Sequence, residues 1–465
     1  MNTAMNTPQN LTLNPNSNRF NLRAGLKEFP REIFEMADTL EILDISGNAF
    51  TSLPVDFDRL HKLRVLFCSD NPFTELPEVL GRCKSLSMVG FRNNRIAHVS
   101  PESLPPNLRW LILTGNQIEE LPAELGRRPL LQKLMVAGNR LKTLPVELAA
   151  CTNLELLRIA ANQLGELPAW LLEMPRLSWL SYSGNPFCAD LEARALVAAP
   201  VALIPWDRLA LQHKLGEGAS GVIHRATING HVDFGNPNAT ESAAECRKDV
   251  AVKLFKGELT SDGLPYSEMA ACMRAGAHPN LIAVQGKIDG HPEDVAGLVM
   301  SLVGSHYRNL AGPPSLESCT RDVYASEMRF SLGQALRIAL DMASVAEQLH
   351  ANGIMHGDFY AHNILVDDTG HALLGDFGAA CFVSESDAEQ AGGLERIEVR
   401  AFGCLLEELL ARVGMSQVKS ISADVFQQVE KLKDNCLDRS VCARPEFKQL
   451  KMRLIELYKP LVTGS

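Results

Sequence analysis

The chain has 465 residues, a length that predicts two or three domains. A formal net charge of −10 and the lack of a lysine and arginine run argue against nucleic acid as a partner. The eleven cysteines show neither a zinc-site spacing nor a Cys-x-x-Cys pair. No apolar run has the length of a membrane span or the place of a signal-peptide core, so the sequence predicts a cytoplasmic protein.

The N-terminal segment is rich in asparagine and threonine. Such a composition cannot bury enough apolar surface to offset the entropy of ordering. We therefore expect a disordered tail over residues 1–20.

A repeat of 22 or 23 residues follows this tail. Each unit begins with leucine in a Leu-x-x-Leu pattern or its valine equivalent, and an asparagine comes eight residues after the leucine. The leucines are Leu40, Leu63, Leu86, Leu108, Leu131, Leu154 and Leu177, and the asparagines are Asn48, Asn71, Asn94, Asn116, Asn139, Asn162 and Asn185. One unit cannot bury its apolar side alone, so the units are expected to stack into a curved parallel sheet. Each asparagine would then bond buried backbone groups where a strand turns.

This pattern is identified as the leucine-rich repeat. The resemblance implies an α/β solenoid with its caps over residues 21–205. A partial first unit lies at 26–30 and a closing cap at 185–199.

Function in such an array lies on the strand positions between the leucines that are expected to be exposed. These positions are Phe67, Arg92, Trp110, Ile112, Lys133, Met135, Arg158 and Trp179. Exposed aromatic and methionine side chains commonly mark interfaces. We therefore predict that Phe67, Trp110, Met135 and Trp179 form a concave surface for a protein partner. The alternative is that this face packs on the second half of the chain.

A short apolar linker at 200–206 leads into the second half and suggests that the two domains pack together. A Gly-x-Gly-x-x-Gly loop follows at 216–221, between two strand-like stretches. Glycines let the backbone close over phosphates and point N–H groups at them. The motif also occurs in dinucleotide folds, but those continue into a helix, whereas residues 223–228 have strand character.

The next elements are Val-Ala-Val-Lys at 250–253 and a helical stretch that begins at Glu268. In this order the motifs resemble the small lobe of eukaryotic-type protein kinases. The resemblance implies that Lys253 holds the α- and β-phosphates and that Glu268 pairs with its ammonium. It also implies that Met300 is the gatekeeper and that residues 301–303 form the hinge that reads adenine.

A helix is predicted over 331–351, with Ser331 as its N-cap and Gly353 just past its end. It delivers the segment His-Gly-Asp-Phe-Tyr-Ala-His-Asn at 356–363, and Asp-Phe-Gly follows at 376–378. Phosphoryl transfer needs a carboxylate that aligns the attacking hydroxyl and metal ions on the phosphates. Asp358 is placed to orient or accept the hydroxyl proton. Asn363 and Asp376 supply the hard oxygen ligands that Mg²⁺ prefers.

The kinase resemblance covers the chain from about Trp206 to its end. It implies a two-lobed α+β domain over 206–465, with a small lobe at 206–303, a large lobe at 304–465, and ATP and Mg²⁺ as cofactors. Its catalytic residues would be Lys253, Glu268, Asp358 and Asn363. The ATP-binding residues would be Leu215, Gly216, Gly218, Gly221, Ile223, Ala251, Lys253, Met300, Ser301 and Val303.

The chain also departs from the family pattern. Gly357 replaces the usual arginine, Tyr360 replaces the lysine typical of serine/threonine kinases, and Glu398 stands where an aspartate is usual. The stretch from 378 to 400 is short and lacks Ala-Pro-Glu. The missing arginine normally receives a phosphorylated activation loop. We therefore hypothesise that activity does not depend on such phosphorylation.

The sequence thus predicts a cytoplasmic leucine-rich-repeat protein kinase, transferring phosphate to serine or threonine on a protein. Two alternatives stay open. His-Gly-Asp with an asparagine five residues after the aspartate also resembles the aminoglycoside and choline kinases, whose substrates are small molecules. The chain could also be a nucleotide-binding scaffold in which the repeats carry the function.

Overall fold

The computed structural model describes residues 14–198, 202–218, 220–229, 247–257, 259–260, 262–384, 386–414 and 420–463. The chain divides into two compact units. The repeat unit holds the chain up to Leu177 together with Asn185–Phe187, and the two-lobed unit holds Ser178–Gly184 and the chain from Cys188 onward. The sequence predicts the domain boundary at 205/206, whereas the two units first divide between Leu177 and Ser178. Strand β8 (Trp179–Ser181) and helix α1 (Ala189–Ala198) both belong to the two-lobed unit.

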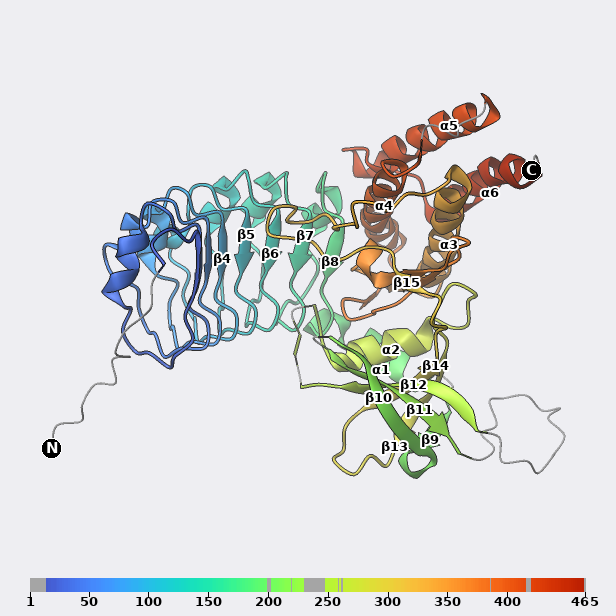
Figure 1. The fold of residues 1–465 in the computed structure, drawn as a ribbon, viewed down its shortest axis with the longest axis horizontal. Helices are drawn as coiled ribbons and strands as arrows, with labels where there is room; N and C mark the ends of the chain where they lie inside the picture. Colours follow the sequence, from blue (N-terminus) through green and yellow to red (C-terminus); the bar gives the residue numbers. More distant parts are fainter. Residues whose placement is uncertain are drawn as a thin grey trace. The chain divides into compact units, whose positions relative to one another are not determined.

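The repeat unit is a solenoid with a parallel sheet along one side, as predicted (Figure 1). Each strand has three residues and pairs in register with the next. The strands are β1 (Arg19–Asn21), β2 (Ile42–Asp44), β3 (Val65–Phe67), β4 (Met88–Gly90), β5 (Trp110–Ile112), β6 (Lys133–Met135) and β7 (Leu156–Arg158). Short 3-10 helices follow the strands. They are η1 (Arg31–Met36), η2 (Phe57–Arg59), η3 (Glu78–Arg82), η4 (Pro101–Ser103), η5 (Ala123–Arg127), η6 (Val146–Ala150) and η7 (Ala169–Glu173).

The leucine that opens each repeat is buried in the core of the solenoid. The repeat asparagines turn inward, and Asn116 is representative. Its Oδ1 accepts from the backbone N–H of Ile96 at 3.0 Å, and its Nδ2 donates to the carbonyls of Phe91 and Leu113, both at 2.9 Å. These bonds satisfy backbone groups that have no strand partner, so the predicted role of the asparagines is confirmed.

The predicted N-terminal tail over 1–20 is partly wrong. Residues 1–13 lie outside the described part of the chain, but Arg19 and Phe20 belong to β1 and pair with Ile42 and Leu43 of β2. The first strand is added without the leucine that opens the later repeats, so the repeat pattern did not reveal it.

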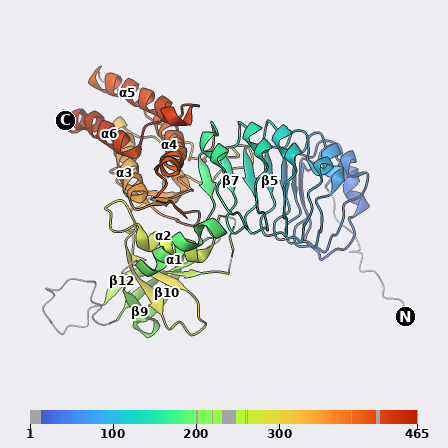
Figure 2. The same cartoon turned by 180° about the vertical axis from the view of Figure 1, so that it is seen from behind.

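The small lobe of the two-lobed unit is built on a six-stranded sheet in the order β10-β11-β12-β14-β13-β9. Its strands are β9 (Leu203–Pro205), β10 (Leu209–Glu217), β11 (Gly221–Ile228), β12 (Lys248–Phe255), β13 (Val284–Asp289) and β14 (Gly297–Ser301). Helix α2 (Pro265–Arg274) lies beside α1, as Figure 1 and the reverse view in Figure 2 both show.

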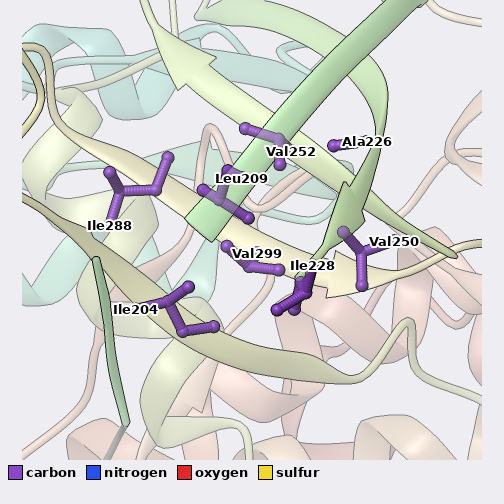
Figure 3. Close-up of a cluster of buried hydrophobic side chains, with 8 residues drawn as sticks. All are labelled: Ile204, Leu209, Ala226, Ile228, Val250, Val252, Ile288 and Val299. Carbon is purple, nitrogen blue, oxygen red and sulfur yellow. The ribbon is translucent and has the colours of Figure 1, made fainter. Parts of the chain in front are cut away.

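The apolar linker has a different explanation from the one predicted. Strand β9 runs parallel to β13, and Ile204 is fully buried in the core of the small lobe. Figure 3 shows Ile204 in one cluster with side chains from other strands of this sheet, including Val250 and Val299. The linker is therefore apolar because it is an edge strand of the small lobe.

The large lobe is mostly helical. It contains α3 (Leu332–Ala351), α4 (Ala388–Leu410), α5 (Ser420–Cys436) and α6 (Phe447–Thr463). Short segments β15 (Arg308–Asn309), β16 (Ile354–Met355), η10 (Ala361–Asn363), β17 (Ile364–Val366), β18 (Ala372–Leu374) and β19 (Cys381–Phe382) lie against them. The helix predicted over 331–351 is confirmed. Ser331 caps it and forms a capping box with Gln334, and Gly353 follows its end with a φ of 66°.

None of the helices in the described part of the chain combines the length and the hydropathy that a bilayer span requires.

Candidate active site

A cavity of about 150 Å³ lies between the small and large lobes. It is lined by Gly218, Ser220, Gly221, Ile223, Lys253, Glu268, Cys272, Ala275, Gly276, Leu281, Ile282, Val284, Leu298, Met300, Leu374, Gly375, Asp376 and Phe377. Most of the lining is apolar, and its charged members are Lys253, Glu268 and Asp376. Such a pocket suits a flat apolar ring with a charged group attached.

Lys253 of β12 and Glu268 of α2 form an ion pair in this cavity. The Lys253 side chain is 11% exposed and the Glu268 side chain 2%. Burial by itself would lower the pKa of Lys253, but the carboxylates of Glu268 and Asp376 outweigh it and raise that pKa. Burial also raises the pKa of Glu268, against the opposing effect of the Lys253 ammonium. The lysine therefore stays charged and is held by a partner that cannot reach solvent.

The glycine-rich loop closes one end of the cavity. The Gly218 N–H donates to the Gly221 carbonyl at 2.9 Å, which forms the turn between β10 and β11. A Cβ on Gly221 would lie 2.6 Å from the Leu254 carbonyl oxygen, so only glycine fits beside β12. Apart from their chain neighbours, none of the residues that the structure describes has an atom within 4 Å of a Cβ built on Gly216 or Gly218, so there is open space beside this loop.

Asp358 and Asn363 meet across the turn η10. The Asn363 Nδ2 donates to Asp358 Oδ2 at 2.8 Å and to the Asp358 carbonyl at 3.0 Å. Because its nitrogen bonds Asp358, the amide oxygen of Asn363 is the atom that would coordinate a metal. Asp358 is half-buried.

His356 connects this loop to the Asp-Phe-Gly segment. It is fully buried, its Nε2 lies 2.9 Å from the Gly375 carbonyl, and its ring lies 5.0 Å from that of Phe377. Asp376 itself has a left-handed φ of 50°, and its Oδ1 accepts from the Gly378 N–H at 3.1 Å. These contacts turn the Asp376 carboxylate into the cavity.

Comparison with known proteins agrees with this geometry. The family model of protein tyrosine and serine/threonine kinases matches residues 209–403, and that of the leucine-rich repeat matches residues 39–60. The two-lobed unit contains a protein kinase domain. Lys253, Glu268, Asp358, Asn363 and Asp376 all fall within the matched kinase range.

Two relatives illustrate the similarity of the kinase domain. The chain is 29% identical over 209 residues to fibroblast growth factor receptor 1 of Pleurodeles waltl. This match covers 44% of the chain and 25% of the receptor. It is 26% identical over 195 residues to the proto-oncogene serine/threonine-protein kinase mos of Mus musculus, covering 40% of this chain and 51% of the relative. The chain thus spans between a quarter and half of the length of these relatives.

The residues of the kinase domain fit ATP and Mg²⁺. A protonated lysine, two open glycines and an apolar cavity suit a nucleotide. The carboxylate of Asp376 and the amide oxygen of Asn363 are the hard donors that Mg²⁺ takes in proteins. The cavity is below the roughly 300–1,000 Å³ typical of ligand sites, so we expect a nucleotide to widen it.

Some residues predicted to bind ATP do not line the cavity. They are Leu215, Gly216, Ala251, Ser301 and Val303. Ser301 is hydrogen-bonded to its neighbours in the small lobe. Its N–H donates to the Ala283 carbonyl at 2.9 Å, and its Oγ accepts from Gln285 at 3.0 Å. Sequence reasoning missed Val284, Leu298 and Leu374, which line the cavity. The local sequence shows only that these residues belong to apolar strands. It does not tell whether an apolar side chain lines a cavity or lies in the core.

Glu398 holds the catalytic loop from α4. It is fully buried and accepts from the backbone N–H groups of Gly357 at 2.7 Å and His356 at 3.2 Å, with His350 Nε2 at 2.8 Å. In the sequence this glutamate is only a departure from the usual aspartate. The longer side chain makes backbone bonds that only tertiary packing reveals.

The prediction that Trp179 is an exposed partner-binding residue is wrong. Trp179 is 1% exposed, and its indole stacks on Tyr360 of the kinase domain with ring centroids 4.1 Å apart. Lys133 and Arg158 are also buried, although they were expected to be exposed. Phe67, Trp110 and Met135 remain partly exposed.

Proposed function

We propose that the chain is an ATP- and Mg²⁺-dependent protein kinase acting on serine or threonine. The observation that carries the proposal is that Lys253, Glu268 and Asp376, from three separate segments, converge on one cavity beside the glycine-rich loop. The Asp358–Asn363 contact lies on the segment that leads into that cavity.

Each residue has a chemical role in this proposal. Asp358 orients the substrate hydroxyl and takes its proton, while Lys253 holds the phosphates in place through its ammonium. Asn363 and Asp376 would hold the metal. Mg²⁺, when bound, offsets the negative charge of the phosphates. The buried Glu268 keeps the Lys253 side chain from turning away.

The choice of serine or threonine rests on the printed description of mos as a serine/threonine-protein kinase. The family description covers tyrosine kinases as well. Peptides that differ only in serine, threonine or tyrosine at the acceptor position test this choice. Preferential phosphorylation of the tyrosine peptide would reassign the specificity.

We further propose that the repeats bind a protein partner or the substrate through Phe67, Trp110 and Met135. These side chains come from β3, β5 and β6 and are partly exposed, and the Lys133 ammonium lies 4.3 Å from the centre of the Trp110 ring. A pull-down with the Trp110→Ala and Met135→Ala double variant should lose the partner. Val146→Ala, at an apolar side chain on η6 that is 62% exposed, is the matched control. Equal capture by all three proteins would contradict this role.

The test of kinase activity is transfer from radiolabelled ATP to a generic basic protein. Asp358→Asn should lower the rate by about 10²–10⁴-fold, because the positioned carboxylate is lost. Asp207→Asn, at an exposed aspartate of the small lobe, should leave the rate unchanged. Transfer to choline or an aminoglycoside, and not to protein, would establish the small-molecule alternative. ATP binding without transfer to either would establish the scaffold alternative.

A cytoplasmic location remains part of the proposal. Cell fractionation with the tagged chain tests it, and recovery in the membrane or secreted fraction would contradict it.

A further inference from the structure

Seven residues of the last repeat, Ser178–Gly184, belong to the two-lobed unit. Trp179 and Leu180 of this segment lie beside the catalytic loop, here defined as residues 356–363. Ser178, Leu180, Ser181 and Ser183 are all 1% exposed or less. A segment with no place in the kinase motifs is therefore buried.

Trp179 makes the closest approach to the catalytic residues. Its ring is within 6° of parallel to that of Tyr360, and its Nε1 donates to the Phe359 carbonyl at 3.3 Å. Phe359 and Tyr360 directly follow Asp358 in the chain. The indole therefore holds the two residues after the catalytic aspartate through both a ring stack and a hydrogen bond.

His362 also lies beside Tyr360. The ring of His362 lies 5.0 Å from that of Tyr360, and the backbone N–H of His362 donates to Asp322 Oδ2 at 3.0 Å. His362 Nδ1 lies 2.8 Å from Asp322 Oδ1. The rings of Trp179, Tyr360 and His362 thus make successive contacts, and Tyr360 and His362 lie between Asp358 and Asn363 in the chain.

Further contacts keep the segment in place. The Tyr182 hydroxyl donates to the Phe382 carbonyl at 3.1 Å, and Arg400 Nη1 donates to Ser178 Oγ at 2.7 Å. A Cβ on Gly357 would lie 2.6 Å from the Leu180 carbonyl oxygen. The absence of a side chain at Gly357, where the family has arginine, is therefore what lets β8 approach the loop.

We propose that Trp179 is a positioning residue of the kinase, and that Ser178–Gly184 hold the catalytic loop in place of a phosphorylated activation loop. The inference rests on the proposed kinase function and deepens it. In this arrangement Asp358 is half-buried, whereas Tyr360 is only 4% exposed. The ring that replaces the usual lysine faces Trp179 and is not available to a substrate.

The test compares Trp179→Ala and Trp179→Phe with the parent chain, using a generic basic protein as substrate. Trp179→Ala should lower kcat by about 10- to 100-fold, because small displacements of a catalytic group have costs of that size. The KM for ATP should stay within about two-fold, because the nucleotide cavity is not touched. Trp179→Phe keeps a stacking ring and should recover most of kcat. Trp170→Ala, at a partly exposed tryptophan on η7, is the control and should match the parent.

Hydrogen exchange of residues 356–363 gives a readout that needs no activity. Faster exchange in Trp179→Ala, with the rest of the domain unchanged, is the expected result. If Trp179→Ala does not fold, Tyr360→Leu removes the same stack from the loop side and should give the same fall in kcat.

The outcomes separate the two proposals. A parent chain no more active than Asp358→Asn would end the kinase function, while the exchange experiment would still decide whether Trp179 holds the loop. An active parent with unchanged kcat and unchanged exchange in Trp179→Ala would overturn the positioning role. A rise in kcat would also overturn it, because the segment would then be a block.

Discussion

The side-chain amide of Asn363 donates to the carboxylate of Asp358, with Nδ2 2.8 Å from Oδ2. A second bond from the same nitrogen reaches the Asp358 carbonyl at 3.0 Å. The asparagine thus orients the aspartate while its own oxygen is turned to the other side. In the proposed kinase, this one residue would serve both the Asp358 carboxylate and the metal.

This double role predicts different results for two substitutions. Asn363→Ala removes the bond and the ligand, and should lower kcat by about 100-fold or more. Asn363→Asp keeps an oxygen ligand but replaces the donor with a like charge. We expect it to retain Mg²⁺ dependence while losing rate. A Mg²⁺ titration of activity measures both effects, with Asn435→Ala on the exposed side of α5 as the control. Full activity in Asn363→Ala would contradict the assignment.

Glu398 predicts a pH-dependent stability. Burial would raise its pKa, but the bonds from His350 and the Gly357 N–H outweigh this and lower it below the ordinary value of 4.5. A carboxyl whose pKa falls on folding stabilises the folded state above its unfolded pKa, and that stability is lost as the pH falls through the folded value. Glu398→Gln should therefore lower the free energy of unfolding by about 2–4 kcal/mol at pH 7.

Urea unfolding at pH 7, 5 and 4 measures this effect. The gap between the parent and Glu398→Gln should be complete at pH 7 and should shrink below about pH 4.5, where the unfolded carboxyl takes up a proton. A gap that widens on acidification would contradict the lowered pKa.

Gly357 predicts that the arginine usual in the family cannot be restored. Its φ is 74°, and an added Cβ would lie 2.5 Å from the Ala379 carbonyl oxygen. Gly357→Ala should destabilise the domain by about 3 kcal/mol or more, through backbone strain and overlap together. Gly290 has a φ of 70° with open space around it, so Gly290→Ala should cost only about 1–2 kcal/mol. Thermal unfolding of both variants separates the cost of backbone strain from the cost of steric overlap. Equal losses of stability in the two variants would mean that overlap with the Ala379 carbonyl adds nothing at Gly357.

The asparagine ladder predicts the stability of the repeats. Asn116→Ala leaves the Ile96 N–H and two buried carbonyls without their partner, so we expect a loss of about 2–4 kcal/mol. Asn107→Ala removes a single exposed bond to the Lys84 carbonyl and should change little. Chemical unfolding followed by circular dichroism compares them. Similar losses for both variants would mean that the ladder contributes no more than a surface bond.

The proposed independence from activation-loop phosphorylation gives the last prediction. Ser384 and Ser386 are the hydroxyls of the short segment before α4, and their oxygens lie 2.8 Å apart. Phosphatase treatment should leave activity within about two-fold, because Gly357 offers no charged group to receive a phosphate. The Ser384→Ala and Ser386→Ala double variant should match the parent. If phosphatase treatment and the double variant both abolished activity, the kinase would depend on phosphorylation of this segment.

The order of the kinase motifs and the period of the repeats could be read from the sequence alone. The opening leucines and the asparagines recur at a regular spacing, which predicts that the repeats stack. Stacking in turn predicts that these residues are buried in the core of the solenoid. The Lys253–Glu268 pair could also be predicted, because both residues belong to motifs of recognisable local sequence.

Tertiary structure alone decided the environments of Trp179, Ile204 and Glu398. By its place in the repeat, Trp179 has the pattern of Trp110, yet it is buried against Tyr360 while Trp110 stays partly exposed. A local pattern sets which way a side chain points, but its exposure depends on what lies opposite. In this chain the partner of Trp179 comes about 180 residues later, and no periodicity within a single repeat encodes that contact.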